Sequence, residues 1–372
     1  MKKPIAIWMP GGVGGGYYSQ GIPVISKLID DLSAVYSISI YSFHPPNEDF
    51  KPNGYKLHSI DRRIKYNWLR WTFLGLLFLK HHHKMNYRLL YAFWGFPAGV
   101  VTVVLSKVVK RPSIIHLQGG DAVYIPSIGY GSLKGIAKGL MLWAYKQCTL
   151  LIALTSFQKN KLTEAGLTRD VDVIPFGTDL KLFPLKQTDI NSQPVRFLHV
   201  GNLLPVKDQV TLLNTFATIS KSISAELRII GEDHLNNLIH KRCRELDLQD
   251  KVEFMDIQPY EQMPLHYAWA DVLLMTSLYE GQCMAIAEAA ASGILIAGTR
   301  IGMLADWNDQ FACIVEVGDA EGLSDEVVKT IQNRENRSKR IEQAWKYVST
   351  KDRNWTFNEI CKRIETCIAD HS

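Results

Sequence analysis

Two glutamates eight residues apart form the pair of side chains best suited to chemistry in this sequence. Glu280 lies in a predicted turn, and Glu288 lies in a predicted helix of small and apolar residues. A carboxylate in such a helix is costly to bury unless hydrogen-bond donors reach it. We predict that Glu280 accepts hydrogen bonds from sugar hydroxyls and that Glu288 accepts them from a ribose. The alternative is one glutamate at the surface and one capping glutamate in the core.

The backbone between the two glutamates is suited to bind an anion. Gly281 allows a tight turn, and Gln282, Cys283 and Met284 begin the predicted helix. The first N–H groups of a helix have no partner within it, and they favour phosphate. The segment therefore predicts a sugar, a diphosphate and a ribose bound in a row.

A lysine follows the first strand of the same half of the chain. Lys207 comes after the predicted strand 195–200 and the turn at Gly201 and Asn202. Its ammonium group could meet a phosphate at the end of that strand. The alternative is a surface lysine that pairs with Asp208.

A glycine-rich loop, residues 10–16, follows the strand 4–9 and precedes a predicted helix over 17–32. Glycines let backbone N–H groups approach an anion closely. The G-x-G-x-x-G pattern of dinucleotide folds is absent, since Tyr17 and Ser19 stand where its last glycine would be. A turn without a ligand is the alternative.

Short apolar runs alternate with helix-length segments along the whole chain, which predicts parallel sheets covered on both faces. The alternation pauses at residues 175–190, a segment that contains two prolines and a glycine before a polar stretch. We therefore expect two doubly wound α/β domains, residues 1–180 and 181–350, and a C-terminal helix, 351–372, that packs against the first domain. Ligands of such sheets bind at the carboxyl ends of the strands, so a cleft between the domains is the expected active site.

The composition excludes several classes of protein. With 372 residues, 47% hydrophobic and 21% charged, the chain is neither disordered nor collagen-like. Its six cysteines are scattered and form no C-x-x-C pair, which favours reduced thiols in the cytosol over disulfides or a zinc site. We expect no secretory signal and no membrane-spanning helix.

Charge is divided unequally along the chain. Residues 1–180 contain 21 Lys and Arg against 10 Asp and Glu, whereas residues 181–372 contain 21 against 27. Residues 51–111 contain 12 basic residues and only one acid, with eleven aromatic residues among them. This stretch suits an anionic membrane surface or nucleic acid, and a solvated face around core helices is the third interpretation.

The sequence resembles the retaining glycosyltransferases of the GT-B fold, specifically family 4. The resemblance covers nearly the whole chain and is carried by the glycine loop, Val-Gly-x(5)-Lys at 200–207, Glu-x(7)-Glu at 280–288 and the linker 174–183. It implies two Rossmann-like domains that face a central cleft. It also implies that Gly11, Gly12 and Val13 lie beside the phosphates and the acceptor.

The resemblance assigns roles to further residues. Lys207 would neutralise the departing diphosphate, and His116 or Asp121 would stand beside the reacting carbon; the choice between the two stays open. The family usually has arginine where this chain has Asn202, and Arg300 is a candidate to compensate. Asparagine is usual where this linker has Phe176.

The expected function is hexosyl transfer from a UDP- or GDP-linked sugar to an acceptor hydroxyl, with no metal and no other cofactor. The acceptor would be a saccharide or lipid-linked, as in the synthesis of surface polysaccharide, lipopolysaccharide or glycolipid. The enzyme would be cytoplasmic or peripheral on the inner face of the membrane, and no nucleic acid is expected. An epimerase of the same fold and a non-catalytic sugar-nucleotide binding protein are the alternatives.

Overall fold

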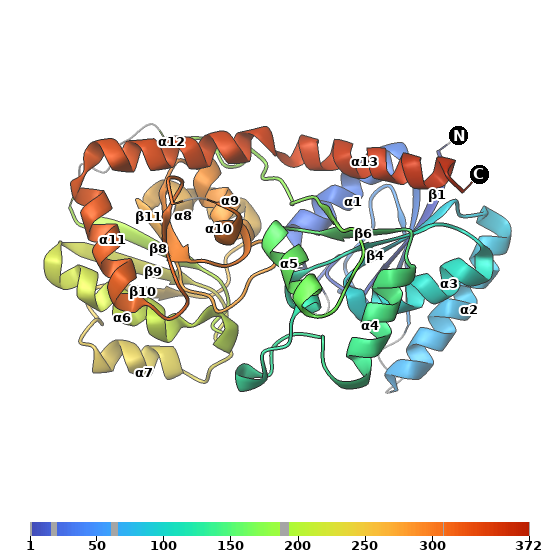
Figure 1. Ribbon diagram of the computed structural model, residues 1–372, viewed down its shortest axis with the longest axis horizontal. Helices are drawn as coiled ribbons and strands as arrows, with labels where there is room; N and C mark the ends of the chain where they lie inside the picture. The colour runs from blue at the N-terminus through green and yellow to red at the C-terminus, as the bar shows by residue number, and fades with distance from the viewer. Residues whose placement is uncertain (1, 16–20, 61–65, 187–192, 308, 372) are drawn as a thin grey trace. The chain divides into compact units, whose positions relative to one another are not determined.

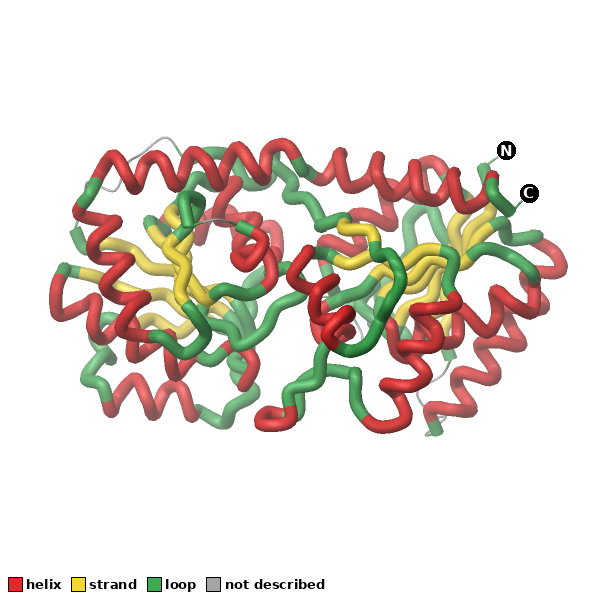
Figure 2. The backbone as a smooth tube through the Cα atoms, viewed as in Figure 1, coloured by secondary structure: helices red, strands yellow, loops and turns green. Residues whose placement is uncertain are grey.

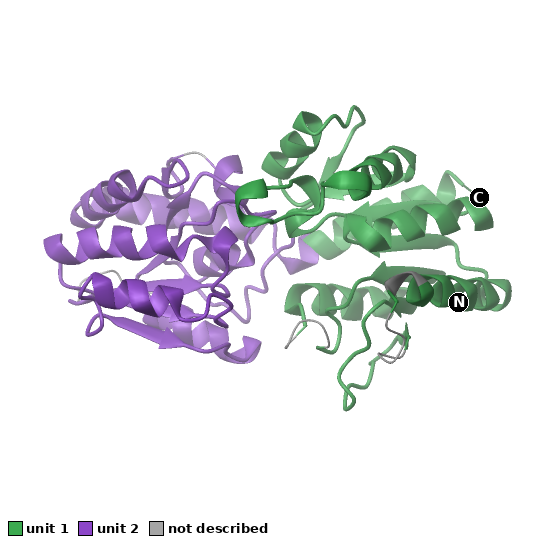
Figure 3. Ribbon diagram, turned by 90° about the horizontal axis from the view of Figure 1, so that it is seen from below, with its two compact units in different colours: residues 1–175, 356–372 green, residues 176–355 purple. Residues whose placement is uncertain are grey.

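The computed structural model describes residues 2–15, 21–60, 66–186, 193–307 and 309–371. The chain divides into two compact units: unit 1 consists of residues 1–175 and 356–372, and unit 2 consists of residues 176–355 (Figure 3). The sequence places the corresponding boundaries at 180 and 350. The last helix thus belongs to unit 1, although it follows unit 2 in the sequence.

Unit 1 is built on a seven-stranded parallel sheet with the strand order β3-β2-β1-β4-β5-β6-β7 (Figure 1). Its strands are β1 (Pro4–Met9), β2 (Ser37–Ser42), β3 (Lys56–Ser59), β4 (Leu89–Phe93), β5 (Ser113–His116), β6 (Leu150–Ala153) and β7 (Asp172–Val173). Its helices are α1 (Pro23–Val35), α2 (Asn67–Met85), α3 (Val100–Val109), α4 (Gly135–Gln147), α5 (Ser156–Glu164) and most of α13 (Arg353–Ala369). Strand β4 is buried along its whole length, as its continuous apolar sequence requires between two helical layers.

Unit 2 repeats this architecture with six parallel strands in the order β10-β9-β8-β11-β12-β13. The strands are β8 (Val195–Val200), β9 (Ala225–Ile230), β10 (Val252–Met255), β11 (Val272–Met275), β12 (Leu295–Thr299) and β13 (Cys313–Val315). The helices are α6 (Gln209–Ser222), α7 (Leu238–Glu245), α8 (Met263–Trp269), α9 (Met284–Ala291), α10 (Gly302–Asp306), α11 (Ala320–Gln332) and α12 (Arg334–Thr350). In each unit the strands form one central layer among the helices (Figure 2).

The strand order fixes where each sheet can bind a ligand. In unit 1 the chain proceeds from β1 to β2 on one side and resumes at β4 on the other side of β1. In unit 2 the same reversal occurs between β8 and β11. Loops on the two sides of such a switch point diverge and leave a crevice at the carboxyl ends of the strands. The residues that follow β1 and β4, and those that follow β8 and β11, are therefore the ones to examine.

The two units have different cores. Unit 1 packs aromatic rings: Trp8 stacks on Tyr41 with ring centroids 4.8 Å apart, and Phe78 stacks on Tyr87 at 5.6 Å. Unit 2 packs α9, with its five alanines, against β11 and β12. Small side chains let a helix approach the sheet closely, which explains why a run of alanines is buried here.

Most of the predicted elements are present, and the differences have physical reasons. The helix predicted over 17–32 is α1, Pro23–Val35, and residues 16–20 lie outside the described part. Strands β3 and β13 were not predicted, because three or four residues at the edge of a sheet carry little periodicity. No helix in the described ranges is both long and apolar enough to cross a bilayer.

Candidate functional site

Lys207 and Glu280 meet at the switch point of the second sheet. Lys207 ends a 3-10 turn after β8, and Glu280 lies in the loop after β11. The Lys207 Nζ donates to Glu280 Oε1 at 2.5 Å, and both side chains are mostly buried. Lys207 thus pairs with Glu280, whereas Asp208 caps α6 by accepting from the Thr211 backbone N–H. Sheets of this kind bind their ligands at the switch point, and contact between the ammonium group and a diphosphate stays a prediction.

Backbone and hydroxyl contacts hold this pair in place. The Leu278 N–H donates to the Val206 carbonyl at 2.8 Å, and Thr276 Oγ1 donates to the Asp208 carbonyl at 2.9 Å. Ser277 Oγ donates to Glu280 Oε1 at 2.9 Å. The loop after β8 and the loop after β11 are therefore joined by several hydrogen bonds. These bonds help to hold Lys207 and Glu280 in position in addition to the ion pair itself.

Glu288 is buried in α9 and accepts hydrogen bonds from protein groups. Tyr267 donates to one carboxyl oxygen at 2.8 Å, and Tyr260 donates to the other at 3.1 Å. Burial raises the pKa of Glu288 to about 7, and the two tyrosine hydroxyls oppose part of that rise. The donors that the sequence assigns to a ribose are thus supplied by two tyrosines, and contact with a ribose stays a prediction.

The start of α9 has two features that are common at anion-binding sites: no side-chain cap and a strained backbone. Helix α9 begins at Met284, and its N-cap residue, Cys283, makes no side-chain capping hydrogen bond. Cys283 adopts φ 76° and ψ 91°, which is unfavourable for a residue with a Cβ. Strained backbone of this kind persists where surrounding structure holds it, commonly at functional sites.

The side chain of Gln282 forms hydrogen bonds that were not predicted, in addition to the backbone contact expected of this residue. Its side-chain Oε1 accepts from the Phe176 N–H at 2.8 Å, and its Nε2 donates to the Phe176 carbonyl at 2.7 Å. The loop that carries Glu280 is thereby fixed to the segment where unit 2 begins. Phe176 contributes only backbone groups to this contact, so the residue type there is free to differ from asparagine.

Asn202 and Arg300 have partners of their own. The Asn202 Oδ1 accepts from the Glu232 N–H at 3.1 Å, which joins the loops after β8 and β9. Arg300 donates to Asp309 at 3.0 Å and to Glu316 at 2.9 Å. Arg300 is therefore engaged by two carboxylates. Gly201 lies against the Lys207 side chain, since a Cβ added there would be 3.3 Å from Cε.

Both candidates for the group beside the reacting carbon are buried in unit 1. His116 ends β5, its Nδ1 lies 2.8 Å from the Tyr91 hydroxyl, and burial lowers its pKa to about 3. Asp121 accepts from the Gln118 N–H at 2.7 Å, and burial raises its pKa to about 7. The carboxyl group of Asp121 thus braces the loop after β5. The geometry favours neither residue for contact with a sugar, and the choice between them stays open.

The glycine loop after β1 packs against the segment that follows β2. Gly11, Gly12 and Val13 are buried, and Gly12 has φ 99°. The Gly12 carbonyl accepts from the Ile22 N–H at 2.8 Å. The glycines thus serve a tight turn at the switch point of the first sheet, and their contact with phosphate stays a prediction.

The sequence reasoning missed two residues at these switch points. Gly302, at the start of α10, has φ 52°, and a Cβ added there would lie 2.9 Å from the Glu280 Cβ. Trp94 follows β4 in unit 1 with φ 69° and ψ 147°, again unusual for a residue with a Cβ. The signals that could have identified them are a glycine at the first position of a short helix and an aromatic residue directly after a buried strand.

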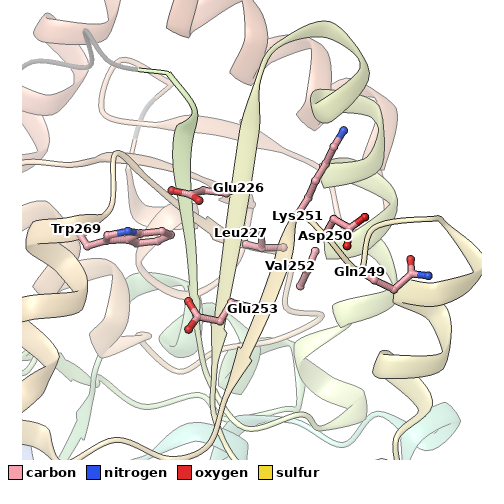
Figure 4. Close-up of a pocket in the computed structure, with 8 residues that line it drawn as sticks. All are labelled: Glu226, Leu227, Gln249, Asp250, Lys251, Val252, Glu253 and Trp269. Atoms are coloured by element: carbon pink, nitrogen blue, oxygen red, sulfur yellow. The ribbon is translucent and has the colours of Figure 1, made fainter.

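A pocket of about 300 Å³ in unit 2 lies away from this site (Figure 4). It is lined by residues at the amino ends of β9 and β10, among them Glu226 and Glu253, and by Trp269. Both carboxylates already form ion pairs, Glu226 with Arg196 and Glu253 with Arg228. The pocket is therefore at the wrong end of the strands for the predicted ligand.

Comparison with known proteins agrees with this architecture. Residues 184–347 match the family described as Glycosyl transferases group 1. An N-acetyl-alpha-D-glucosaminyl L-malate synthase of Bacillus anthracis is 25% identical over 152 residues, which cover 40% of this chain and 39% of that enzyme. The alignment thus spans about two fifths of the relative's own length.

Solved structures resemble the whole chain. The sucrose-phosphate synthase of Thermosynechococcus elongatus has a TM-score of 0.82 at 16% identity and covers 99% of this chain and 100% of its own. Anabaena Alr3699/HepE, solved in complex with UDP and glucose, has a TM-score of 0.75 at 16% identity and covers 98% and 100%. Residues 184–347 therefore match a group 1 glycosyl transferase domain, within a chain whose two Rossmann-like units have the GT-B fold.

Proposed function

We propose that the protein is a retaining glycosyltransferase of family 4, which moves a sugar from a nucleoside diphosphate sugar to an acceptor hydroxyl. The observation that carries the proposal is the pairing of Lys207 with Glu280 at the switch point of the second sheet. One group suits the diphosphate and the other suits sugar hydroxyls, and both lie beside the uncapped start of α9. The match of this unit to group 1 glycosyl transferases supports the same conclusion.

In the proposed reaction, the bond between the anomeric carbon and the diphosphate oxygen breaks. The acceptor oxygen forms the new bond on the same face of the sugar, and its proton passes to the leaving phosphate. Lys207 and the backbone N–H groups at the start of α9 stabilise the charge that develops on the diphosphate. Glu280 exchanges its bond with Lys207 for sugar hydroxyls and so orients the sugar. We propose that these groups act without a metal ion.

The donor is identified first, with a panel of UDP- and GDP-linked sugars screened by thermal shift. Nucleotide release is then measured with and without saccharide and lipid-linked acceptors. Conversion of the donor that needs no acceptor would indicate an epimerase, and binding without turnover would indicate a binding protein. The anomeric configuration of the product, determined by NMR, tests retention.

We expect Lys207→Ala and Glu280→Ala each to lower turnover at least about a hundredfold, which is the scale for a lost charge-stabilising contact. Lys241→Ala, an exposed lysine of α7, is the matched control and should leave turnover unchanged. Thermal unfolding of each variant shows whether it is folded. Turnover near the wild-type rate in both site variants refutes the assignment.

A further inference from the structure

Three neighbouring helices of unit 1, α2, α3 and α4, contain no acidic residue. The crossovers through α2, α3, α4 and α5 all proceed in the same direction across the sheet, from β3 to β4, β5, β6 and β7, so right-handed connections place these four helices on one face. The fourth of these helices, α5, contains Glu164, and Figure 1 shows the other three side by side. None of the three includes an Asp or a Glu. The crossover through α1 runs the other way, and α1 contains Asp30 and Asp31.

The outer side of this layer is apolar to an unusual degree. Helix α4 exposes Ile136 at 87%, Leu140 at 42% and Trp143 at 38%. These residues are spaced at i, i+4 and i+7, so they form one stripe along the helix. Four more exposed apolar side chains come from the two neighbouring helices: Phe73, Leu76, Val104 and Val108. Scattered exposed apolar residues are ordinary, but seven on three adjacent helices mark an interaction surface.

Cations are interspersed with these apolar side chains. Exposed lysines lie on all three helices or at their ends: Lys80, Lys84, Lys107, Lys110, Lys134, Lys138 and Lys146. Between Asp121 and Glu164 the sequence contains five lysines and no acid. The three helices thus contain basic residues and no acidic ones, together with exposed apolar side chains that water solvates poorly.

We propose that this layer, formed by the outer faces of α2, α3 and α4, docks on an anionic lipid bilayer. Lysines bind headgroup phosphates, while the α4 stripe enters the boundary between headgroups and acyl chains. The basic stretch 51–111 supplies two of the three helices, and α4 extends the surface beyond it. The inference does not depend on the proposed reaction, because it rests on unit 1 alone.

Two other occupants fit the surface less well. Nucleic acid would pair with the lysines and could stack bases on Phe73 and Trp143, but the other five of the seven exposed apolar side chains are aliphatic and offer no ring. A second copy of this chain in a symmetric dimer would place lysines against lysines. A bilayer with anionic headgroups satisfies both the charge and the apolar groups.

Vesicle flotation tests the proposal with the full chain. We expect binding to vesicles that contain phosphatidylglycerol, weak binding to phosphatidylcholine alone, and loss of binding as salt rises toward about 0.5 M. The double variant Lys138→Glu/Lys146→Glu should bind at least about tenfold more weakly. Ile136→Ser/Leu140→Ser should weaken binding while its salt dependence is retained, since the apolar contribution alone is removed.

Lys241→Glu/Lys339→Glu is the matched control, because it makes the same charge change at exposed positions of unit 2. It should bind like the wild type. The proposal is overturned by absence of binding to anionic vesicles at low salt, by equal loss in the control, or by a dimer that the α4 variants abolish without any vesicle binding. Binding to single-stranded or duplex nucleic acid in preference to vesicles overturns it as well.

Discussion

Single side chains in unit 2 are held in states that cost free energy. Glu288 is a carboxyl group buried among apolar residues, and Cys283 has a backbone conformation that suits glycine. Neither state is needed merely to fill the core. Each state therefore has a measurable consequence for stability.

Glu288 should make stability depend on pH. Its pKa is about 7 in the folded protein and near its ordinary value when unfolded, so the folded state binds more protons between these values. The free energy of unfolding then falls as pH rises through about 7, by up to about 3 kcal/mol. Glu288→Gln should flatten this slope in urea titrations between about pH 5 and 8. Glu335→Gln, at an exposed position of α12, should not flatten it.

At position 283, a glycine variant should be more stable than an alanine variant, which is the reverse of the usual order. Cys283→Gly and Cys283→Ala both remove the sulfur, so their loss of packing is similar. With φ at 76°, alanine keeps the backbone strain and glycine relieves it, so the glycine variant should be more stable by about 1 kcal/mol. Urea denaturation measures the difference. An alanine variant that is equally or more stable would show that the residue does not have this conformation.

At the scale of elements, the loop from β11 to α9 depends on its neighbour α10. Gly302, the first residue of α10, packs against this loop. A methyl group added at Gly302 would clash with the side chain of Glu280. The Met303 N–H also donates to the Gln282 carbonyl at 3.1 Å. The position of Glu280 therefore depends on packing against α10 as well as on its own loop.

Gly302→Ala should displace Glu280 and raise the KM for the donor at least about tenfold, because small misplacements of positioned groups are costly. Gly318→Ala is the matched control. Gly318 also has a positive φ, but nothing lies within 4 Å of an added Cβ. Both variants should lose stability, and only Gly302→Ala should change the donor KM. A similar KM in the two variants would contradict the steric explanation.

Helices and strands with long periodic patterns could be predicted from the sequence. The side-chain contacts between residues far apart in the sequence could not. The spacing of Glu280, Glu288 and Lys207 relative to the strands is visible in the sequence, and it led to the pair found here. The tyrosines that bind Glu288 are 21 and 28 residues away from it, and Gln282 bonds to a residue 106 positions away. No local pattern encodes such contacts. The burial of His116 and Asp121 was missed for the same reason.

At the scale of the whole molecule, α13 completes unit 1 from the far end of the chain. Arg363 donates to Asp172 at 2.5 Å, and Tyr36 donates to Glu365 at 3.0 Å. Lys3 forms an ion pair with Glu365 as well. Helix α13 therefore contacts the residue directly before the first strand of unit 1, the end of α1 and the last strand, β7.

Deletion of residues 356–372 should destabilise unit 1 selectively. The buried faces of Ile360 and Ile364 and the partners of Tyr36 and Asp172 would be lost. In hydrogen exchange with mass spectrometry, we expect lower protection of α1 and β7 and unchanged protection of α6 and β9. Equal loss of protection in the two units would show that they unfold together.

The ends of unit 2 meet each other, and this gives the molecule a particular architecture. The Arg353 N–H donates to the Thr178 carbonyl at 3.1 Å, and Gly177 lies against the backbone of Asp352. Next to them, Thr356 donates to the Pro175 carbonyl at 2.7 Å. Unit 2 is consequently an insertion whose entry and exit are adjacent, which is the geometry that domain grafting tolerates best. The whole of unit 2 could be exchanged here by recombination at two neighbouring junctions, with the other half of the protein kept intact.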